Sequence, residues 1–244
     1  MTTSPYLIVT IYVLTFALWS SLWPRKAVKS RIEPMLGFRA YRILYNIGTI
    51  LLFSLSFAYL SQHTSETVRL WNLRHFRWFQ PLIYLTQGLG VFFLSASTQL
   101  GLSFWGLTNP PADTGLQTNG FYKITRHPLY WSVFFLLFGH LLVFGSGLAL
   151  LYFVLMELYN VAGVIVFENR ALAKNYGSAF RAFHARTSTL PFKSLLQGKV
   201  RWEPGELPKA AVMSSIVFTL VLALLHDPLL ASLMHALPTY VSRD

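Results

Sequence analysis

Six long apolar stretches dominate this chain and leave it few ways to fold. A membrane-spanning helix needs about 20 mostly apolar residues, because the hydrocarbon core of a bilayer offers no water to its backbone groups. Hydrophobic residues make up 54% of the 244 residues and charged ones 12%, whereas an ordinary soluble domain has about 25% charged residues. The sequence therefore predicts an all-α fold, a polytopic membrane bundle of five to six transmembrane helices. The apolar stretches are residues 6–23, 43–60, 79–102, 129–144, 148–167 and 210–237.

Basic residues are distributed unevenly among the polar segments that separate these stretches. Of the 20 Lys and Arg residues, sixteen lie in segments 24–42, 103–128 and 168–209, and three lie in segment 61–78. Cytoplasmic loops of membrane proteins carry such an excess of positive charge. We therefore expect a multi-pass protein of a bacterial inner membrane, with the three basic segments in the cytoplasm and the N-terminus outside. The same rule accounts for the net charge of +11, so we do not expect nucleic acid as a partner. The partners we expect are membrane lipids and an apolar or small-molecule substrate.

The organisation of the chain follows from the breaks between the stretches. Gly145, Ser146 and Gly147 form a connection so short that the fourth and fifth stretches must be antiparallel neighbours. We assign residues 1–209 to one helical membrane domain and residues 210–244 to a C-terminal hydrophobic helix and tail. Beyond the fifth stretch, apolar residues at helical spacing predict a cytoplasmic helix that lies along the membrane interface. These residues are Leu172, Tyr176, Phe180 and Phe183.

The residues before the fourth stretch are the first candidates for chemistry. Pro128 suits the first turn of a helix, so Arg126 and His127 stand at the N-terminus of that helix. Cations are unfavourable at the positive end of a helix dipole unless an anion lies between them and the free amides. This arrangement predicts a bound carboxylate or phosphate. The alternative is that Arg126 reaches lipid headgroups and His127 caps the helix.

Two glutamates on the fifth stretch are further candidates. Glu168 is an acid beside a basic surface, and the tight hairpin must bring it close to Arg126 and His127, which predicts a pocket with both charges. Its alternative role is an exposed ion pair worth about 0–1 kcal/mol. Glu157 lies deeper on the same helical face, where an ionisable group is a hypothesis for a functional site. The alternative is a protonated residue hydrogen-bonded to a neighbour such as Tyr159 or Asn160, or across to the third stretch.

Histidine is the residue left for a metal or haem, because the chain has no cysteine. His140 lies in the fourth stretch, about 18 Å along the helix from Pro128 at about 1.5 Å per residue. It is either a hydrogen-bonded packing residue or a haem ligand. His63, past the second stretch, could approach the same depth.

The motifs resemble those of a known membrane superfamily. The pattern Thr-x-Gly-x-Tyr-x-x-x-Arg-His-Pro-x-Tyr, the hairpin, Glu-x-Arg-x-Leu and Tyr-Gly-x-x-Phe-x-x-Phe are similar over residues 115–192 to the isoprenylcysteine carboxyl methyltransferase superfamily. A closer likeness is to its NnrU and zeta-carotene isomerase branch, over residues 15–200. That likeness is carried by residues 37–44, Leu70-Trp71, 124–128 and 186–192.

This resemblance implies two different chemistries. The first is an integral membrane methyltransferase that uses S-adenosylmethionine on a small or lipophilic substrate at the cytoplasmic face. Arg126, His127 and Glu168 would then be catalytic. Its cofactor would contact Gly120, Tyr122, Arg126, His127, Tyr130 and Glu168, although Ser132 and Asn169 replace a Gly and a second Glu of the pattern.

The alternative that the resemblance implies is a haem-dependent isomerase or a redox-linked protein of the NnrU type. His140 would be a metal ligand of haem b in that case. The second histidine expected on the first helix is missing, because residues 18–21 read Leu-Trp-Ser-Ser. A third hypothesis is a membrane scaffold without catalysis.

Overall fold

The structure is a computed structural model, and it describes residues 4–73, 75–97, 115–201, 203–206, 209, 212–221 and 224. Regular secondary structure in this part of the chain is helical, and one isolated bridge pairs Arg69 with Ser146. The all-α prediction is confirmed for the described residues.

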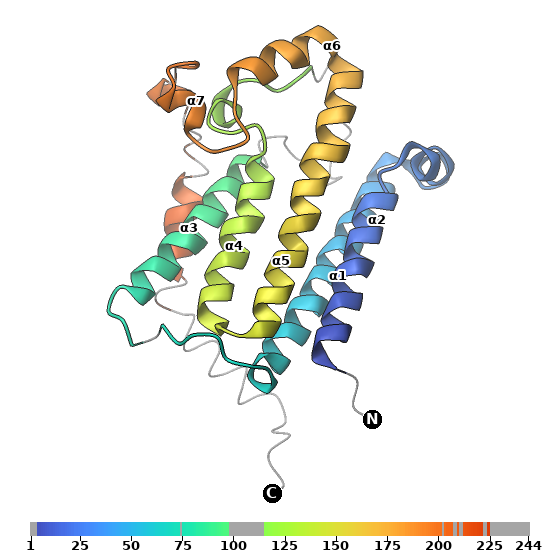
Figure 1. The fold of residues 1–244 in the computed structure, drawn as a ribbon. Coiled ribbons are helices and arrows are strands. Elements are labelled where there is room, and N and C mark those ends of the chain that lie inside the picture. Colours follow the sequence, from blue (N-terminus) through green and yellow to red (C-terminus); the bar gives the residue numbers. More distant parts are fainter. Residues whose placement is uncertain are drawn as a thin grey trace, which may run out of the picture.

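Four helices lie side by side and form the body of the molecule (Figure 1). They are α1 (Pro5–Leu22), α2 (Lys26–His63), α4 (Pro128–Phe144) and α5 (Gly147–Ala162). The helix α3 (Phe79–Ser97) packs against α4, and Val212–Val221 lies beside α3, where Ser95 Oγ and Ser214 Oγ are 2.6 Å apart. The predicted apolar stretches 79–102 and 210–237 are thus helical as far as they are described.

Side chains from α1, α2, α4 and α5 meet in one hydrophobic core, which includes Val9, Leu60, Leu137, Leu148 and Tyr152. The Tyr152 hydroxyl reaches Ser56 Oγ on α2 at 3.0 Å, so the buried phenol is paired.

Other apolar side chains point out of the bundle. Leu7, Ile11, Leu14 and Leu18 form an exposed stripe on α1, and Leu150, Val154 and Leu158 form one on α5. Large apolar faces of this kind mark surfaces that contact lipid or other proteins.

Length and composition identify two helical stretches capable of crossing a membrane. They are Pro5–Leu22 and Lys26–Glu66, whereas Pro128–Phe144, Gly147–Ala162 and Val212–Val221 are shorter apolar helices. The predicted number of five to six transmembrane helices is therefore not confirmed by the described part of the chain.

The turn between α4 and α5 is fastened by the loop that follows α2. Gly145 has a left-handed conformation with φ 58°, and its carbonyl accepts bonds from Leu70 N at 2.7 Å and Trp71 N at 3.2 Å. A Cβ at this position would lie 2.3 Å from the Trp71 carbonyl oxygen, so the loop approaches closely only because the residue is glycine. Ser146 caps α5 by accepting a bond from Ala149 N at 3.2 Å, which confirms the tight antiparallel hairpin.

The opposite end of the bundle carries the polar elements (Figure 1). The chain of α5 passes through a π-helix (Gly163–Glu168) into α6 (Asn169–Arg186), which bends at Gly177 and is followed by the short α7 (Lys193–Leu196). The first part of α2 also lies at this end and turns at Gly37, whose φ is 77°. The helix predicted from Leu172 to Phe183 is confirmed as part of α6, while its place in the cytoplasm stays a prediction.

Candidate functional site

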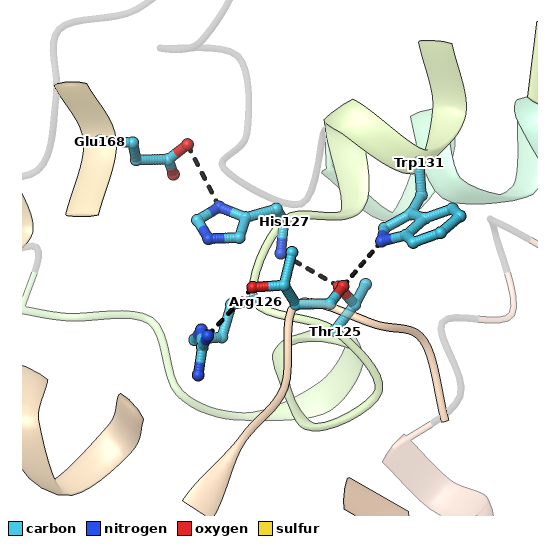
Figure 2. A network of polar contacts seen from close by, with 6 residues as sticks. Thr125, Arg126, His127, Trp131 and Glu168 are labelled. Carbon is cyan, nitrogen blue, oxygen red and sulfur yellow. Dashed lines mark hydrogen bonds and ion pairs between the residues drawn. The ribbon is translucent and has the colours of Figure 1, made fainter. Parts of the chain in front are cut away.

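The segment before α4 is held by a second segment far along the chain, residues 187–192. Arg126 N donates to Ser188 O and Phe192 N donates to Ile124 O, both at 3.0 Å. Thr189 O accepts bonds at 2.7 Å from Thr125 Oγ1 and from Trp131 Nε1 (Figure 2). Buried backbone groups must be paired, and these bonds pair them while fixing the entry to α4.

Arg126 directs its guanidinium into the same segment. Nη1 donates to His184 O at 2.9 Å and to Thr187 O at 2.5 Å, and Nη2 donates to Thr189 Oγ1 at 3.0 Å. Partial burial lowers the pKa of Arg126. The sequence predicted that this guanidinium binds an external anion. In the described part of the chain its Nη1 and Nη2 donate to protein oxygens, so Arg126 connects the start of α4 to residues 184–189.

His127 turns the other way and faces Glu168 (Figure 2). His127 Nδ1 lies 3.2 Å from Glu168 Oε2, in an ion-pair contact that lacks hydrogen-bond geometry. The imidazole side chain is 1% exposed, and the carboxylate side chain is 37% exposed. The predicted meeting of the hairpin ends is confirmed, and His127 makes no capping bond with its side chain.

Glu168 owes its position to the π-helix that ends at this residue. Such turns occur frequently at functional sites, and the wider turn shifts the side chains that follow it around the helix. Glu168 accepts a hydrogen bond from the Tyr130 side chain. Burial raises the pKa of Tyr122, and the Glu168 charge adds to this effect, so Tyr122 belongs to the same electrostatic neighbourhood. Gly120 serves the backbone here: with φ 61° it begins the turn Gly120–Lys123 that carries Tyr122.

A cavity of about 480 Å³ opens beside Glu168, between the end of α1, α2, the start of α4 and the π-helix. This volume is within the range of about 300–1,000 Å³ that small-molecule sites occupy. His127 is not in its wall but behind Glu168, with its ring centroid 5.7 Å from that of Tyr130. The wall includes Ser20, Ser21, Arg25, Tyr45, Tyr130, Tyr159, Gly163, Phe167 and Glu168.

Most of this wall was missed in the sequence. Tyr45 and Tyr159 lie within apolar stretches, where an aromatic residue reads as core, and the adjacent Ser20 and Ser21 were noticed only as positions without histidine. Two consecutive serines near the end of an apolar stretch are the signal that would have indicated a polar wall. Gly163 has a specific role, because a Cβ there would lie 3.2 Å from the Tyr130 hydroxyl.

The two deeper polar residues are paired inside the protein. Glu157 Oε1 accepts a bond from Asn160 Nδ2 at 3.2 Å, and Asn160 is one of the neighbours that the sequence suggested. His140 Nδ1 lies 2.7 Å from Leu136 O on its own helix and 3.4 Å from Gln87 Nε2 on α3. The ring of Phe57 packs edge-on against this imidazole, with centroids 4.7 Å apart.

The two histidines considered as haem ligands have different neighbours in the described residues. His63 lies at the end of α2, where its Nδ1 is 2.9 Å from Glu66 Oε1 and its ring packs on Tyr59. The neighbours of His140 include Leu136 O and the ring of Phe57. On α1, Trp19 donates to Tyr45 O at 3.3 Å. Haem binding by His140 therefore stays a prediction.

Comparisons with known proteins give the chain a family. It is 26% identical to a 15-cis-zeta-carotene isomerase of Zea mays over 167 residues, which cover 68% of this chain and 45% of the relative. It is also 26% identical to the 15-cis-zeta-carotene isomerase of Arabidopsis thaliana over 202 residues, which cover 80% of this chain and 52% of the relative. The chain thus spans about half the length of these curated relatives. No solved structure matches it.

The family comparison covers more of the sequence than either relative. The model of the NnrU protein family matches residues 7–233, which include the segment before α4, the α4–α5 hairpin and Glu168. The NnrU branch of the resemblance is supported, whereas the wider methyltransferase superfamily is not shown. The chain belongs to the NnrU family.

Proposed function

We propose that this protein is a membrane isomerase that interconverts the cis and trans forms of a double bond in a lipophilic, unsaturated substrate. The similarity to two 15-cis-zeta-carotene isomerases carries the proposal, and it favours this activity over methyl transfer. The exposed apolar faces of α1 and α5 suit a protein whose substrate is dissolved in a bilayer.

The cavity beside Glu168 supplies groups for such a reaction without an oxidant or reductant. In the proposed step Glu168 reacts in its neutral form, not in the charged form that pairs with His127. Its carboxyl group donates a proton to one end of a conjugated diene, and the electron pair of that double bond forms the new C–H bond. The resulting allylic cation has single-bond character where the double bond stood, so rotation becomes possible. One of the two hydrogens now on that carbon then returns to the carboxylate as a proton, and the electron pair of its C–H bond re-forms the double bond in the other geometry.

The rest of the wall can assist this step. Tyr45, Tyr130 and Tyr159 present aromatic rings to the cavity, and the face of an aromatic ring attracts a cation by roughly 0.5–2 kcal/mol. Tyr130 orients Glu168 through its hydrogen bond, and His127 supports the carboxylate from behind. In this proposal Glu168 is the catalytic residue, and Tyr130 and His127 are positioning residues.

Methyl transfer from S-adenosylmethionine stays a prediction without support from these contacts. It relied on Arg126 to bind the cofactor carboxylate, and that guanidinium is bonded to His184 O, Thr187 O and Thr189 Oγ1.

The test uses the purified full chain in lipid nanodiscs, incubated in the dark with a polyene that carries a central cis double bond. Chromatography of the geometric isomers measures the conversion. We expect Glu168→Gln to slow the reaction by about 10²-fold or more, the usual contribution of a general acid. The matched control is Glu66→Gln, because Glu66 forms the same kind of pair with His63 away from the cavity.

Deuterated water separates proton transfer from other mechanisms. In deuterated water the exchangeable carboxyl proton of Glu168 is deuterium, so the protonated carbon holds one deuterium beside its original hydrogen. Loss of the original hydrogen leaves deuterium in the product, which mass spectrometry detects. Isomerisation without deuterium uptake would contradict the proton route. The absence of any isomerisation by the wild type, or equal rates for the two glutamine variants, would overturn the proposal.

A further inference from the structure

A second cavity lies on the polar end of the bundle, apart from Glu168. Its volume is about 260 Å³, and it is formed where three segments converge: residues 118–123, the end of α6, and residues 199–201. None of the residues that line it also lines the cavity beside Glu168. The two cavities are therefore separate sites in the described structure.

Basic side chains surround this second cavity. They are Lys123, Arg186, Lys199 and Arg201, and Thr118 and Asn119 add a hydroxyl and an amide to the wall. No carboxylate is among the lining residues. Like charges repel across a shared concavity, and the repulsion is relieved when an anion lies between them.

One of the four cations is already neutralised. Lys123 Nζ forms an ion pair with Glu206 and also donates to Arg201 O at 3.3 Å, which fixes the geometry of this side of the cavity. Arg186 Nε donates to Ala182 O of its own helix at 3.3 Å. Within the described ranges, the ion pairs do not include Arg186, Lys199 or Arg201, so three positive charges face the cavity without a protein counter-charge.

Apolar side chains stand next to this basic cluster. Leu190, Phe192 and Leu196 are 51%, 44% and 86% exposed, although a bond from Phe192 N to Ile124 O holds their segment against the residue beside Lys123. Exposed apolar residues next to Lys and Arg are typical of a surface that lies in a membrane interface, where the apolar groups enter the acyl boundary and the cations meet anionic headgroups.

We infer that this basic cavity binds a phosphate-ester group, with the headgroup of an anionic phospholipid as the expected source. Arginine suits phosphate because its planar guanidinium donates two parallel hydrogen bonds to the oxygens. The cavity is smaller than the sites of about 300–1,000 Å³ that hold drug-sized molecules, so it fits a compact headgroup. A soluble phosphate ester has the same chemistry and is the other possible source.

Native mass spectrometry of the full chain in detergent tests this inference. The probes are phosphatidylglycerol, phosphatidylcholine and soluble glycerol 3-phosphate. We expect phosphatidylglycerol to bind in preference to phosphatidylcholine. The double variant Lys199→Gln with Arg201→Gln should weaken this binding by about fivefold per cation, which corresponds to roughly 1 kcal/mol for each charge at a membrane surface.

A control variant distinguishes the cavity from general charge. Lys174→Gln with Arg181→Gln removes the same number of charges from exposed positions of α6 that do not line the cavity. We expect it to bind phosphatidylglycerol as the wild type does. The single variant Lys199→Gln serves as a milder version, because this side chain is exposed and forms no ion pair with the residues that the structure describes.

The outcomes separate the sources and the possible failure. Tight binding of phosphatidylglycerol alone assigns the site to a lipid headgroup, and competition by glycerol 3-phosphate assigns it to a soluble ester. Equal losses in the pocket and control variants would overturn the inference. So would the absence of any preference for phosphatidylglycerol or glycerol 3-phosphate, which carry net negative charge, over phosphatidylcholine, whose phosphate is balanced by its choline cation. These readouts are independent of isomerase activity.

Discussion

His127 and Glu168 meet across the α4–α5 hairpin, with Nδ1 3.2 Å from Oε2, although they lie far apart in the chain. The imidazole is buried and the carboxylate is partly exposed to the cavity, so one side of the pair faces protein and the other faces a potential substrate. This orientation separates the residue that reacts from the residue that holds it in place.

A double-mutant cycle measures that relationship. His127→Ala and Glu168→Gln each remove one partner, and contacting residues usually show a coupling of about 0.5–3 kcal/mol. We expect coupling in this range in the free energy of unfolding, followed by denaturant titration in detergent. The same cycle on His63 and Glu66, which are more exposed to solvent, should give a smaller value. Additive effects of the two substitutions at 127 and 168 would contradict a direct interaction.

Arg126→Lys tests the structural role of the guanidinium. Lysine keeps the charge but cannot reach the oxygens of His184, Thr187 and Thr189 together. We expect a loss of about 1.5–3 kcal/mol in unfolding free energy, the usual value for hydrogen bonds to a charged group. Arg170→Lys, at an exposed position of α6, is the control and should change little. Unaltered stability of the Arg126 variant would show that these bonds do not contribute.

Gly145→Ala should destabilise the bundle for two reasons. A left-handed conformation costs a residue with a Cβ about 1–2 kcal/mol, and the new methyl group would also lie 2.3 Å from the Trp71 carbonyl. Gly198→Ala has a similar φ of 66° but open space around it, so it pays only the conformational cost. We expect a clearly larger drop in melting temperature for Gly145→Ala. Equal drops would mean that the contact with Trp71 adds nothing.

Gly163→Ala changes the cavity with little effect on the fold. The added methyl group would lie 3.2 Å from the Tyr130 hydroxyl and 3.3 Å from its ring, so the ring must move by a few tenths of an ångström. Misplacement of reacting groups lowers rates by up to about 10²-fold. We expect slower isomerisation at an unchanged melting temperature, while Gly205→Ala, with open space, should keep the wild-type rate. A wild-type rate for Gly163→Ala would place the reaction elsewhere.

The free energy of unfolding should depend on pH through the ionisation of His184 on α6. Burial, together with the charges of Arg126 and His127, lowers the pKa of His184 below its usual value. The folded state then binds fewer protons than the unfolded chain, so the contribution of His184 is fully present above pH of about 6.5 and is lost as the pH falls further. His184→Gln should reduce the fall in melting temperature between pH 7 and pH 5. An identical pH profile for this variant and the wild type would exclude the contribution.

Apolar patterns were sufficient to predict the helices and the hairpin. The predicted stretch 129–144 matches α4 to within a residue, because Pro128 and Gly145 mark its ends in the sequence. The same patterns gave no sign that α2 begins at Lys26, since its first turns are polar and charged. Hydropathy identifies the apolar part of a helix, but it does not show how far the helix continues into polar residues.

The sequence predicted that His127 and Glu168 lie close together, but it did not predict the hydrogen-bond partners of Arg126. The meeting of His127 and Glu168 follows from the short turn at residues 145–147, which sets two helices side by side with their far ends together. The partners of Arg126 are mostly backbone carbonyls, which every residue possesses, so no side-chain pattern indicates them. The π-turn before Glu168 likewise has no sequence signature.

The hydrogen bonds from Leu70 N and Trp71 N to Gly145 O hold the helices together at one end of the bundle more firmly than at the other. Trp71 also donates from its indole to Leu142 O at 3.3 Å, so the chain that leaves α2 is tied to both sides of the α4–α5 turn. Helices that are bonded at one end can move apart only by rotating about that end. Any widening between the α1–α2 pair and the α4–α5 pair is therefore greatest at the far end, where Tyr45, Tyr130 and Glu168 line the cavity. The lipophilic substrate proposed above would then enter at the cavity end as these helices move apart, while the bonds at Gly145 stay in place.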